Sequence, residues 1–140
     1  MIDAQTAPYG AFVLRVTVGI ALLAHAYLKI AVFTIPGTVG FFESLGYPGF
    51  LAYLTILAEL VGGIALILGV GVRVVALATL PILLGAIHAH WGAGWFFVNE
   101  GGGWEYPAFW AAAHVAIAAL GAGAFAVKLP VLEKALGRFA

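Results

Sequence analysis

The sequence predicts an all-α integral membrane protein, a polytopic bundle of four helices arranged as two helical hairpins. Hydrophobic residues make up 64% of the 140-residue chain and charged residues 9%, whereas soluble domains carry about 25% charged residues. Charged side chains are also widely spaced, with none between Arg73 and Glu100 or between Glu105 and Lys128. Each interval exceeds the roughly 20 apolar residues that cross a hydrocarbon core of about 30 Å. The expected surroundings are therefore a lipid bilayer.

Turn and loop signals separate the four expected helices. The helices run from Gly10 to about Ala31, from Pro48 to about Gly69, from Arg73 to about Trp91 and from Pro107 to about Val127. Pro48 and Pro107 suit the first turn of a helix, where a missing backbone N–H breaks no helical hydrogen bond. The first two helices qualify as spans if one ionisable residue is accepted in each. The sequence GVGVR at 69–73 predicts a tight turn between the second and third helices.

Positive residues are unevenly distributed between the two ends of these helices. One end carries Arg15, Arg73, Lys128, Lys134 and Arg138, and the other carries Lys29. Because positive residues favour the cytoplasmic side, we expect both termini in the cytoplasm and the loops 32–47 and 92–106 outside. The chain then divides into an N-terminal cytoplasmic segment (1–9), a membrane domain (10–127) and a basic cytoplasmic tail (128–140).

A short phrase occurs twice, each time in a loop on the outer side. FFESLGYPGF (41–50) and FFVNEGGGWEYPAF (96–109) both begin with Phe-Phe, carry an acid and end on Tyr-Pro-x-Phe before an apolar run. Two similar hairpins related about the membrane normal would explain the repetition. The general use of aromatic residues where a helix enters the membrane would explain it too. Either origin leads to two helical hairpins.

Glu59 is the charged residue expected deepest in the membrane. It lies eleven residues after Pro48, which at about 1.5 Å per residue places it near the middle of the bilayer. A carboxylate at that depth must be paired, protonated or hydrated. Arg15 is the expected partner in a structural ion pair, and a role of Glu59 in handling protons is the alternative. Gly62 and Gly63, one turn further, predict close backbone contact with a neighbouring helix.

Histidines are expected in the outer half of the bundle. His25 and His114 enter from opposite ends of their helices and reach the same depth, and Lys29 shares a helix face with His25 at i, i+4. Three interpretations stay open: axial ligation of a haem, a copper or zinc site that would include His88 and His90, or hydrogen bonds to backbone, hydroxyls or a quinone carbonyl. Covalent haem is excluded because Cys-x-x-Cys-His is absent.

Aromatic residues crowd the same outer end. An interfacial belt explains their position, since amphipathic rings favour that depth. An aromatic-lined pocket for a flat, lipid-soluble ligand is the alternative, because the glycines at 101–103 let the second outer loop bend over the bundle. The predicted ligand site, between the first and fourth helices, consists of His25, Lys29, His114, Trp104, Tyr106 and Trp110.

Three segments carry a resemblance to a known family. LRVTVGIALLAHAYLKI (14–30), AELVGGIALILGVGVR (58–73) and GWFFVNEGGGWEYPAF (94–109) resemble the DoxX family of small four-helix membrane proteins. The resemblance covers about residues 10–127. Members often end the fourth helix with Gly-Pro-Gly, a tyrosine or phenylalanine, and an aspartate. GAGAFAVK at 121–128 lacks that proline and ends in lysine.

The resemblance implies a function linked to quinones. The family takes its name from a membrane subunit of a thiosulfate:quinone oxidoreductase, and relatives are linked to thiol and oxidative-stress systems. It implies a multi-pass subunit in the cytoplasmic (inner) membrane of a bacterium or archaeon. Other membrane or membrane-associated redox subunits, or further copies of the chain, would be its partners. Glu59 would then lie near the proton route.

Two other functions compete with this one: a non-catalytic membrane scaffold or small-molecule carrier, and a haem- or metal-binding membrane protein. The chain contains no cysteine, which excludes disulfides, thiol redox chemistry and thiolate metal sites. Its formal net charge of zero gives no indication of nucleic-acid binding.

Overall fold

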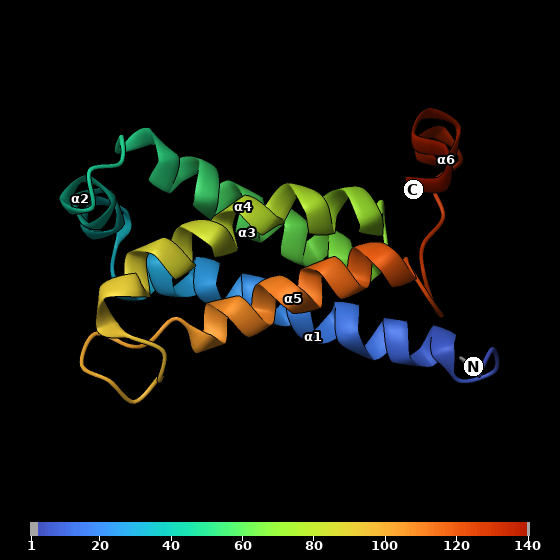
Figure 1. Cartoon of the computed structure of the whole chain (residues 1–140). Helices are drawn as coiled ribbons and strands as arrows, with labels where there is room; N and C mark the ends of the chain where they lie inside the picture. The colour runs from blue at the N-terminus through green and yellow to red at the C-terminus, as the bar shows by residue number, and fades with distance from the viewer. Residues whose placement is uncertain (1–2, 140) are drawn as a thin grey trace.

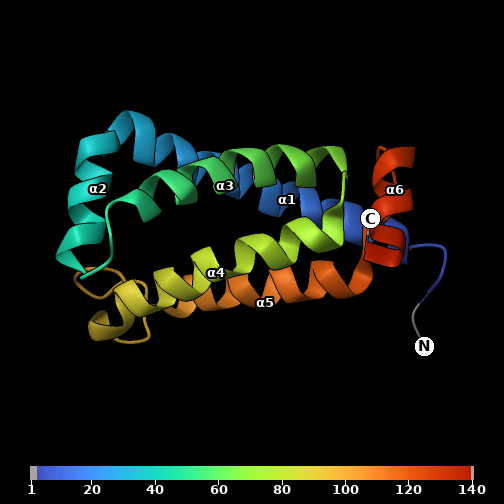
Figure 2. The same cartoon turned by 90° about the horizontal axis from the view of Figure 1, so that it is seen from above.

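The described chain, residues 3–139 of a computed structural model, is helical with no strand. Its elements are α1 (Ala7–Tyr27), the π-helix η1 (Leu28–Val32), α2 (Ile35–Ser44), α3 (Phe50–Leu68), α4 (Val72–His90), the 3₁₀-helix η2 (Trp91–Ala93), α5 (Glu105–Leu120), α6 (Pro130–Leu136) and the 3₁₀-helix η3 (Gly137–Phe139). The long helices α1, α3, α4 and α5 lie alongside one another, and α2 lies across one end (Figures 1 and 2). The two ends of the chain lie at the opposite end.

The long helices associate as two pairs. The most extensive packing joins α1 to α3 and α4 to α5, while α3 with α4 and α1 with α5 make smaller interfaces. Each pair consists of consecutive long helices, which is the arrangement of two hairpins that the sequence predicts. The bounds of α3 and α4 agree with the expected second and third helices to within two residues.

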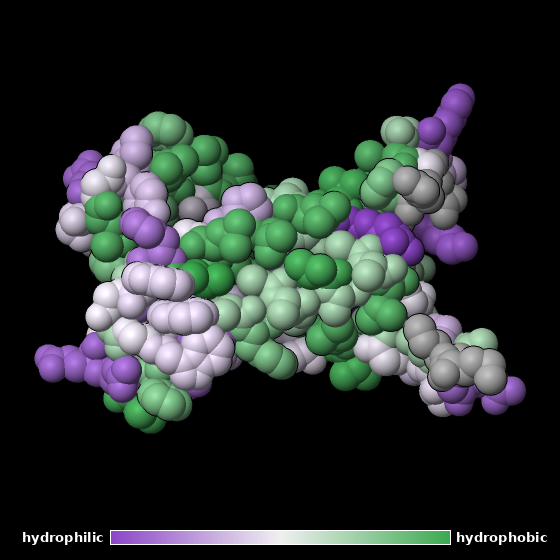
Figure 3. Space-filling view, in the orientation of Figure 1, coloured by the Kyte–Doolittle hydropathy of each residue, from purple (hydrophilic) through white to green (hydrophobic). Residues whose placement is uncertain are grey.

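The exterior of the long helices is apolar. Three segments are long and apolar enough to cross a membrane: Ala7–Val32, Phe50–Leu68 and Val72–Ala93. Hydrophobic residues cover the middle of the face in Figure 3, and hydrophilic residues gather towards its two ends. Along α3 the residues Leu54, Leu57, Val61 and Ile64 are each more than half exposed. Apolar side chains thus face the surroundings, as a bilayer requires.

The fourth helix is shorter than predicted. Apolar sequence continues to about Val127, but α5 ends at Leu120 and has 16 residues, fewer than the roughly 20 of a typical span. Gly121 ends it with a φ of +84°, a conformation that glycine adopts without steric strain. The residues from 121 to 129 are not helical, and their carbonyls bind elsewhere, as described below.

The first outer loop is also more ordered than predicted. Residues 35–44 form α2, which begins after Thr34, whose side chain accepts a hydrogen bond from the backbone N–H of Gly37 at 3.3 Å. This is a side-chain cap of the helix N-terminus. The hydroxyl of Thr38 donates to the carbonyl of Lys29 at 3.0 Å. The cap and this bond hold α2 against the end of the first helix.

Glycine allows α1 and α3 to touch through their backbones. A Cβ at Gly19 would lie 2.8 Å from the carbonyl oxygen of Gly63, and one at Gly63 would lie 2.8 Å from that of Gly19. A Cβ at Gly62 would lie 2.7 Å from the side chain of Thr79 on α4. The close contact predicted at Gly62 and Gly63 is therefore confirmed. Gly63 contacts α1, and Gly62 contacts α4.

Gly63→Ala is expected to destabilise the protein, since the new methyl group would overlap Gly19 and Leu23. Overpacking of this kind costs about 1–3 kcal/mol. Gly85→Ala on α4 is the control, because a Cβ there meets no atom within 4 Å. The control should gain up to about 1 kcal/mol from helix propensity. Unfolding in detergent, followed by circular dichroism, measures both variants, and equal effects would contradict backbone contact at Gly63.

Candidate functional site

Arg15 ties together the helix ends on the side where the two ends of the described chain lie. Its side chain is completely buried, and its guanidinium donates five hydrogen bonds to backbone carbonyls. The acceptors are Leu66 and Ile67 near the end of α3, and Ala122, Ala124 and Phe125 in the segment after α5, at 2.6–3.1 Å. A guanidinium has five N–H donors, so every one is used. This residue therefore has a structural role.

Two of these contacts also satisfy backbone carbonyls in the last turn of α3. The last four carbonyls of a helix lack helical partners. Here Ala65 accepts from the N–H groups of Gly69 and Val70, and Leu68 accepts from the N–H of Val127. Arg15 supplies the donors for the two carbonyls between them. The residues from 121 to 129 are thus fixed against α3 by hydrogen bonds in place of helix.

The predicted ion pair between Arg15 and Glu59 is wrong. Lys29 is the partner of Glu59, with 2.7 Å between Nζ and Oε1. Side chains on a helix lean towards its N-terminus. Arg15 on α1 therefore leans towards the inner end, while Glu59 on the antiparallel α3 leans towards the outer end, and the two diverge. Lys29, beyond the outer end of α1, leans back towards Glu59.

Arg73 repeats the role of Arg15 in the second hairpin. Arg73 lies in the first turn of α4 and donates to the carbonyl of Ala118 near the end of α5 at 2.8 Å. Each hairpin therefore has an arginine in its first helix, Arg15 within α1 and Arg73 in the first turn of α4, that donates to one or more backbone carbonyls near the end of its second helix. This correspondence supports the internal repeat, although α5 is the shorter helix.

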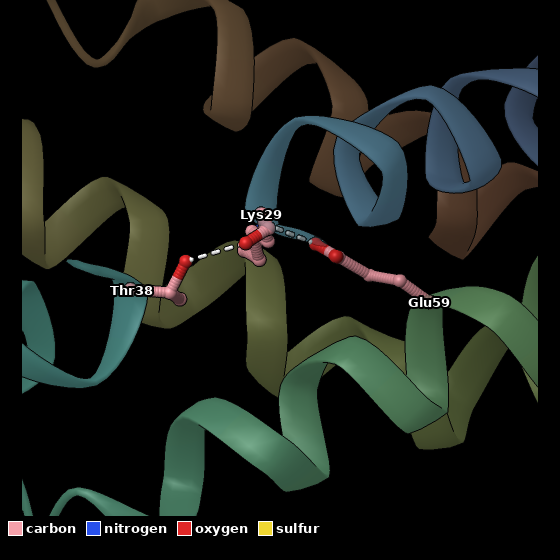
Figure 4. A network of polar contacts seen from close by, with 3 residues as sticks. All are labelled: Lys29, Thr38 and Glu59. Atoms are coloured by element: carbon pink, nitrogen blue, oxygen red, sulfur yellow. Dashed lines mark hydrogen bonds and ion pairs between the residues drawn. The ribbon is translucent and has the colours of Figure 1, made fainter. Parts of the chain in front are cut away.

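Lys29, Thr38 and Glu59 join three elements at the outer end (Figure 4). Lys29 lies in the π-helix η1, where Phe33 N–H bonds to the carbonyl of Leu28 at 2.8 Å. Single π-turns inserted into α-helices recur at functional sites. Lys29 uses its backbone carbonyl to hold α2 through Thr38, and its ammonium to hold α3 through Glu59.

Glu59 leaves one carboxylate oxygen free at the wall of a cavity. Oε1 accepts from Lys29, whereas Oε2 is buried without a hydrogen-bond partner among the described residues. The cavity measures about 1140 Å³, and Glu59 and His25 form part of its wall. The other lining residues belong mainly to α4, the second outer loop and the start of α5. We call it the Glu59 cavity.

Trp110 connects the two histidines of the predicted site. Its ring lies 4.9 Å from that of His25 and 6.0 Å from that of His114, between centroids. His25 and Trp110 line the Glu59 cavity, as does Tyr106, whose ring contacts Trp110 at 5.9 Å. His114 is completely buried behind them, with Nδ1 3.0 Å from the carbonyl of Trp110. Three predicted ligand residues therefore share one cavity.

Two further polar atoms resemble Glu59 Oε2 in lacking a partner. Trp110 Nε1 and His114 Nε2 are buried without a hydrogen bond within the described part of the chain. Leaving such an atom unsatisfied costs about 1–3 kcal/mol. Unsatisfied atoms of this kind are few in native structures and mark places where water or a ligand binds.

Trp104 and Lys29, the other two predicted ligand residues, do not line the Glu59 cavity. Trp104 stacks on Trp91 at 4.8 Å and meets Trp95 edge-on at 4.4 Å, so it closes the outer loop on itself. Lys29 lines a second cavity on the other side of its ion pair. Trp95 and Phe97 line the Glu59 cavity instead. No periodicity in the sequence distinguishes them from the other aromatic residues of that loop.

His88 and His90 make hydrogen bonds that do not converge on one another. His88 Nδ1 lies 2.6 Å from the hydroxyl of Tyr47, and His90 Nδ1 lies 2.9 Å from the carbonyl of Gly101. Among the side chains that the structure describes, no group of three or more His, Cys, Asp or Glu residues could hold a metal ion. His90 nevertheless lines both cavities.

Comparison with known proteins supports the resemblance noted above. The sequence profile of the DoxX family matches residues 10–98. A Bacillus subtilis (strain 168) protein named "Putative oxidoreductase CatD" is 37% identical over 78 residues. The match covers 56% of this chain and 57% of that relative, so the chain spans little more than half of the relative's length. No solved structure gives a significant match.

Lys29→Met and Glu59→Gln are expected to be coupled in stability. Either substitution alone leaves a buried group without its partner, which costs up to about 3–5 kcal/mol, so the double variant should be more stable than the sum of the singles by about 0.5–3 kcal/mol. The matched cycle is Arg15→Lys with Glu59→Gln, which should be additive to within about 0.5 kcal/mol. Unfolding titrations with dodecyl sulfate measure both cycles. Additivity in the first, or coupling in the second, would contradict the assignment.

Proposed function

This chain belongs to the DoxX family, and we propose that it is a membrane subunit of a quinone-linked redox system that binds a quinone headgroup in the Glu59 cavity. The observation that carries the proposal is the unpartnered oxygen of a buried carboxylate at the wall of a cavity with mostly apolar lining. Apolar walls with a few convergent polar groups are the usual composition of a small-molecule site.

The chemistry of the lining residues suits a quinone and its quinol. A quinone carbonyl accepts hydrogen bonds, and the N–H of His25 or Trp110 can donate them. A quinol hydroxyl donates, and Glu59 Oε2 can accept. Oxidation of a quinol releases two protons and two electrons. Glu59 can take up one of the protons and His25 the other, since both line the cavity, and the two electrons would pass to a partner redox subunit.

A redox role agrees with the name of the Bacillus subtilis relative, which describes an oxidoreductase. The name says nothing of a quinone. Its contribution is limited to the class of reaction, because the shared region is about half of each protein. The quinone itself is inferred from the cavity and the family resemblance.

We further propose that α5 is a fourth membrane crossing and that both termini face the cytoplasm. Both ends of the chain lie at the same end of the helices (Figure 1), which requires an even number of crossings. The 16-residue α5 is continued by the apolar segment to Val127, whose carbonyls Arg15 satisfies in place of helix. The protein would be a multi-pass protein of the cytoplasmic membrane.

Cysteine labelling tests this topology, because the native chain has no cysteine. Glu100→Cys and Lys128→Cys replace exposed residues at opposite ends of α5. A membrane-impermeant maleimide added to intact cells should label residue 100 and leave residue 128 unlabelled until the membrane is permeabilised. Labelling of residue 128 alone would reverse the orientation, and labelling of both would remove the fourth crossing.

The quinone proposal is tested on purified protein by organic extraction, followed by chromatography and an absorption spectrum. We expect a quinone to be extracted in a near-stoichiometric amount and no Soret band. The absence of both a quinone and a Soret band would favour the scaffold or carrier, and the presence of a Soret band would favour a haem protein. Either outcome would overturn the proposal.

Added quinone should also quench the fluorescence of the tryptophans around the cavity. His25→Phe keeps a ring against Trp110 but removes the polar nitrogens. It should weaken quinone binding about tenfold or more, the value of a hydrogen bond of about 1.5 kcal/mol. Glu100→Gln, an exposed position of the outer loop, is the control and should leave the affinity unchanged. Equal affinities for the two variants would argue against the assigned site.

A further inference from the structure

A second cavity lies between α2, α3 and α4. It measures about 670 Å³. The helices α3 and α4 are joined by a tight turn at residues 69–71 and diverge towards the end where α2 lies (Figures 1 and 2). Small residues line the facing helices, among them Ala58 on α3 and Gly85 on α4. We call this space the α3–α4 cavity.

The two cavities meet at the ion pair. Ile82, Ala86 and His90 line both of them. Lys29 lines the α3–α4 cavity and Glu59 lines the Glu59 cavity, and their charged groups are 2.7 Å apart. The two cavities therefore adjoin along the ion pair and these three shared side chains.

The α3–α4 cavity also reaches the outer, apolar surface of the helices. Phe41, Leu54 and Leu84 form part of its wall, and each is more than half exposed. Leu54 continues the row of exposed apolar residues along α3. In a membrane these side chains contact lipid, so the cavity opens sideways into the bilayer.

The ammonium and the phenol that line this cavity are already engaged. The ammonium of Lys29 binds Glu59, and the hydroxyl of Tyr47 lies 2.6 Å from His88 Nδ1. A phospholipid in this cavity would need a cation for its phosphate, and Lys29 is already paired. An uncharged apolar chain needs no such partner.

We infer that the α3–α4 cavity holds the apolar tail of the ligand whose headgroup lies in the Glu59 cavity. The ligand class is thereby narrowed to quinones with a long isoprenoid or alkyl chain, which enter from the bilayer between α3 and α4. The inference rests on the proposed function. It makes the space between the two hairpins the entry path, where the helix interface is smaller than within either hairpin.

Gly85→Phe closes the tail cavity without touching the headgroup cavity. Gly85 lines only the α3–α4 cavity of the two, and a Cβ at this position meets no atom within 4 Å. Ala58→Phe approaches from the opposite wall on α3 and serves as a second variant if the first does not fold. Leu77→Phe is the matched control, since it places the same ring on α4 at a surface position outside both cavities.

Binding of two probes to each variant in lipid nanodiscs, measured by tryptophan quenching, tests the inference. The probes are a tail-free dimethoxy-methyl-benzoquinone and its decyl derivative. Lipid solvates an alkyl chain about as well as apolar side chains do, so the expected effect is steric exclusion in the variant. Gly85→Phe should weaken binding of the decyl probe about tenfold or more and leave the tail-free probe unchanged. Leu77→Phe should change neither.

The outcomes separate the two proposals. If Gly85→Phe and Ala58→Phe bind the decyl probe as tightly as the native protein does, the tail cavity is refuted while the headgroup site stands. Equal weakening of both probes would also refute it, because the substitution would then act on the headgroup. If the native protein binds neither probe, the proposed function fails and the tail cavity fails with it.

Discussion

The buried guanidinium of Arg15 is the constraint on which the rest of the structure depends. The last carbonyls of a helix have no partners within that helix, and α3 ends beside a segment that is itself not helical. Five donors from one side chain satisfy both sets of carbonyls. The arginine thus joins the first helix, the end of α3 and the chain beyond α5 at one point. Arg15 on α1 reaches the carbonyls of α3 because glycines bring these two helices close together. It also binds the carbonyls of the non-helical residues that follow the short α5.

The distribution of polarity is the reverse of that in a soluble protein. Arg15, Glu59 and His114 are buried, whereas leucine, valine and phenylalanine cover the outside. The hydrophobic effect does not hold helices together inside a bilayer, so close packing and polar contacts must do so. Glycines bring the backbones together within the first hairpin, and the buried polar residues add directional bonds. Glu59 is one of these buried polar residues and also lines the Glu59 cavity, so stability and the proposed function share this side chain.

The pair of Lys29 and Glu59 separates two spaces with different surroundings. One is roofed by the aromatic outer loop and lined by Glu59, whose second carboxylate oxygen has no hydrogen-bond partner among the described residues. The other opens towards the apolar exterior. In the proposed function the first receives a headgroup and the second its tail, and Lys29 neutralises the carboxylate between them. The π-turn that carries Lys29 is also what attaches α2, so the position of α2 and the charge of the site are linked through one residue.

Composition and the spacing of charges determined the all-helical class of fold and the apolar helices long enough to cross a membrane, and the glycines of α3 determined the close approach at Gly63. These features follow from local chemistry, since each requires only an apolar length, a proline, a glycine or a charge at a certain depth. The partner of Glu59, the end of α5 at Leu120 and the helix α2 were decided by tertiary structure. Depth along the sequence places Arg15 and Lys29 equally well beside Glu59, and only the lean of side chains on antiparallel helices selects Lys29. Likewise, apolar sequence continues past Leu120, but the carbonyls there bind Arg15 from another helix. Such a contact joins residues more than a hundred positions apart, and no local pattern records it.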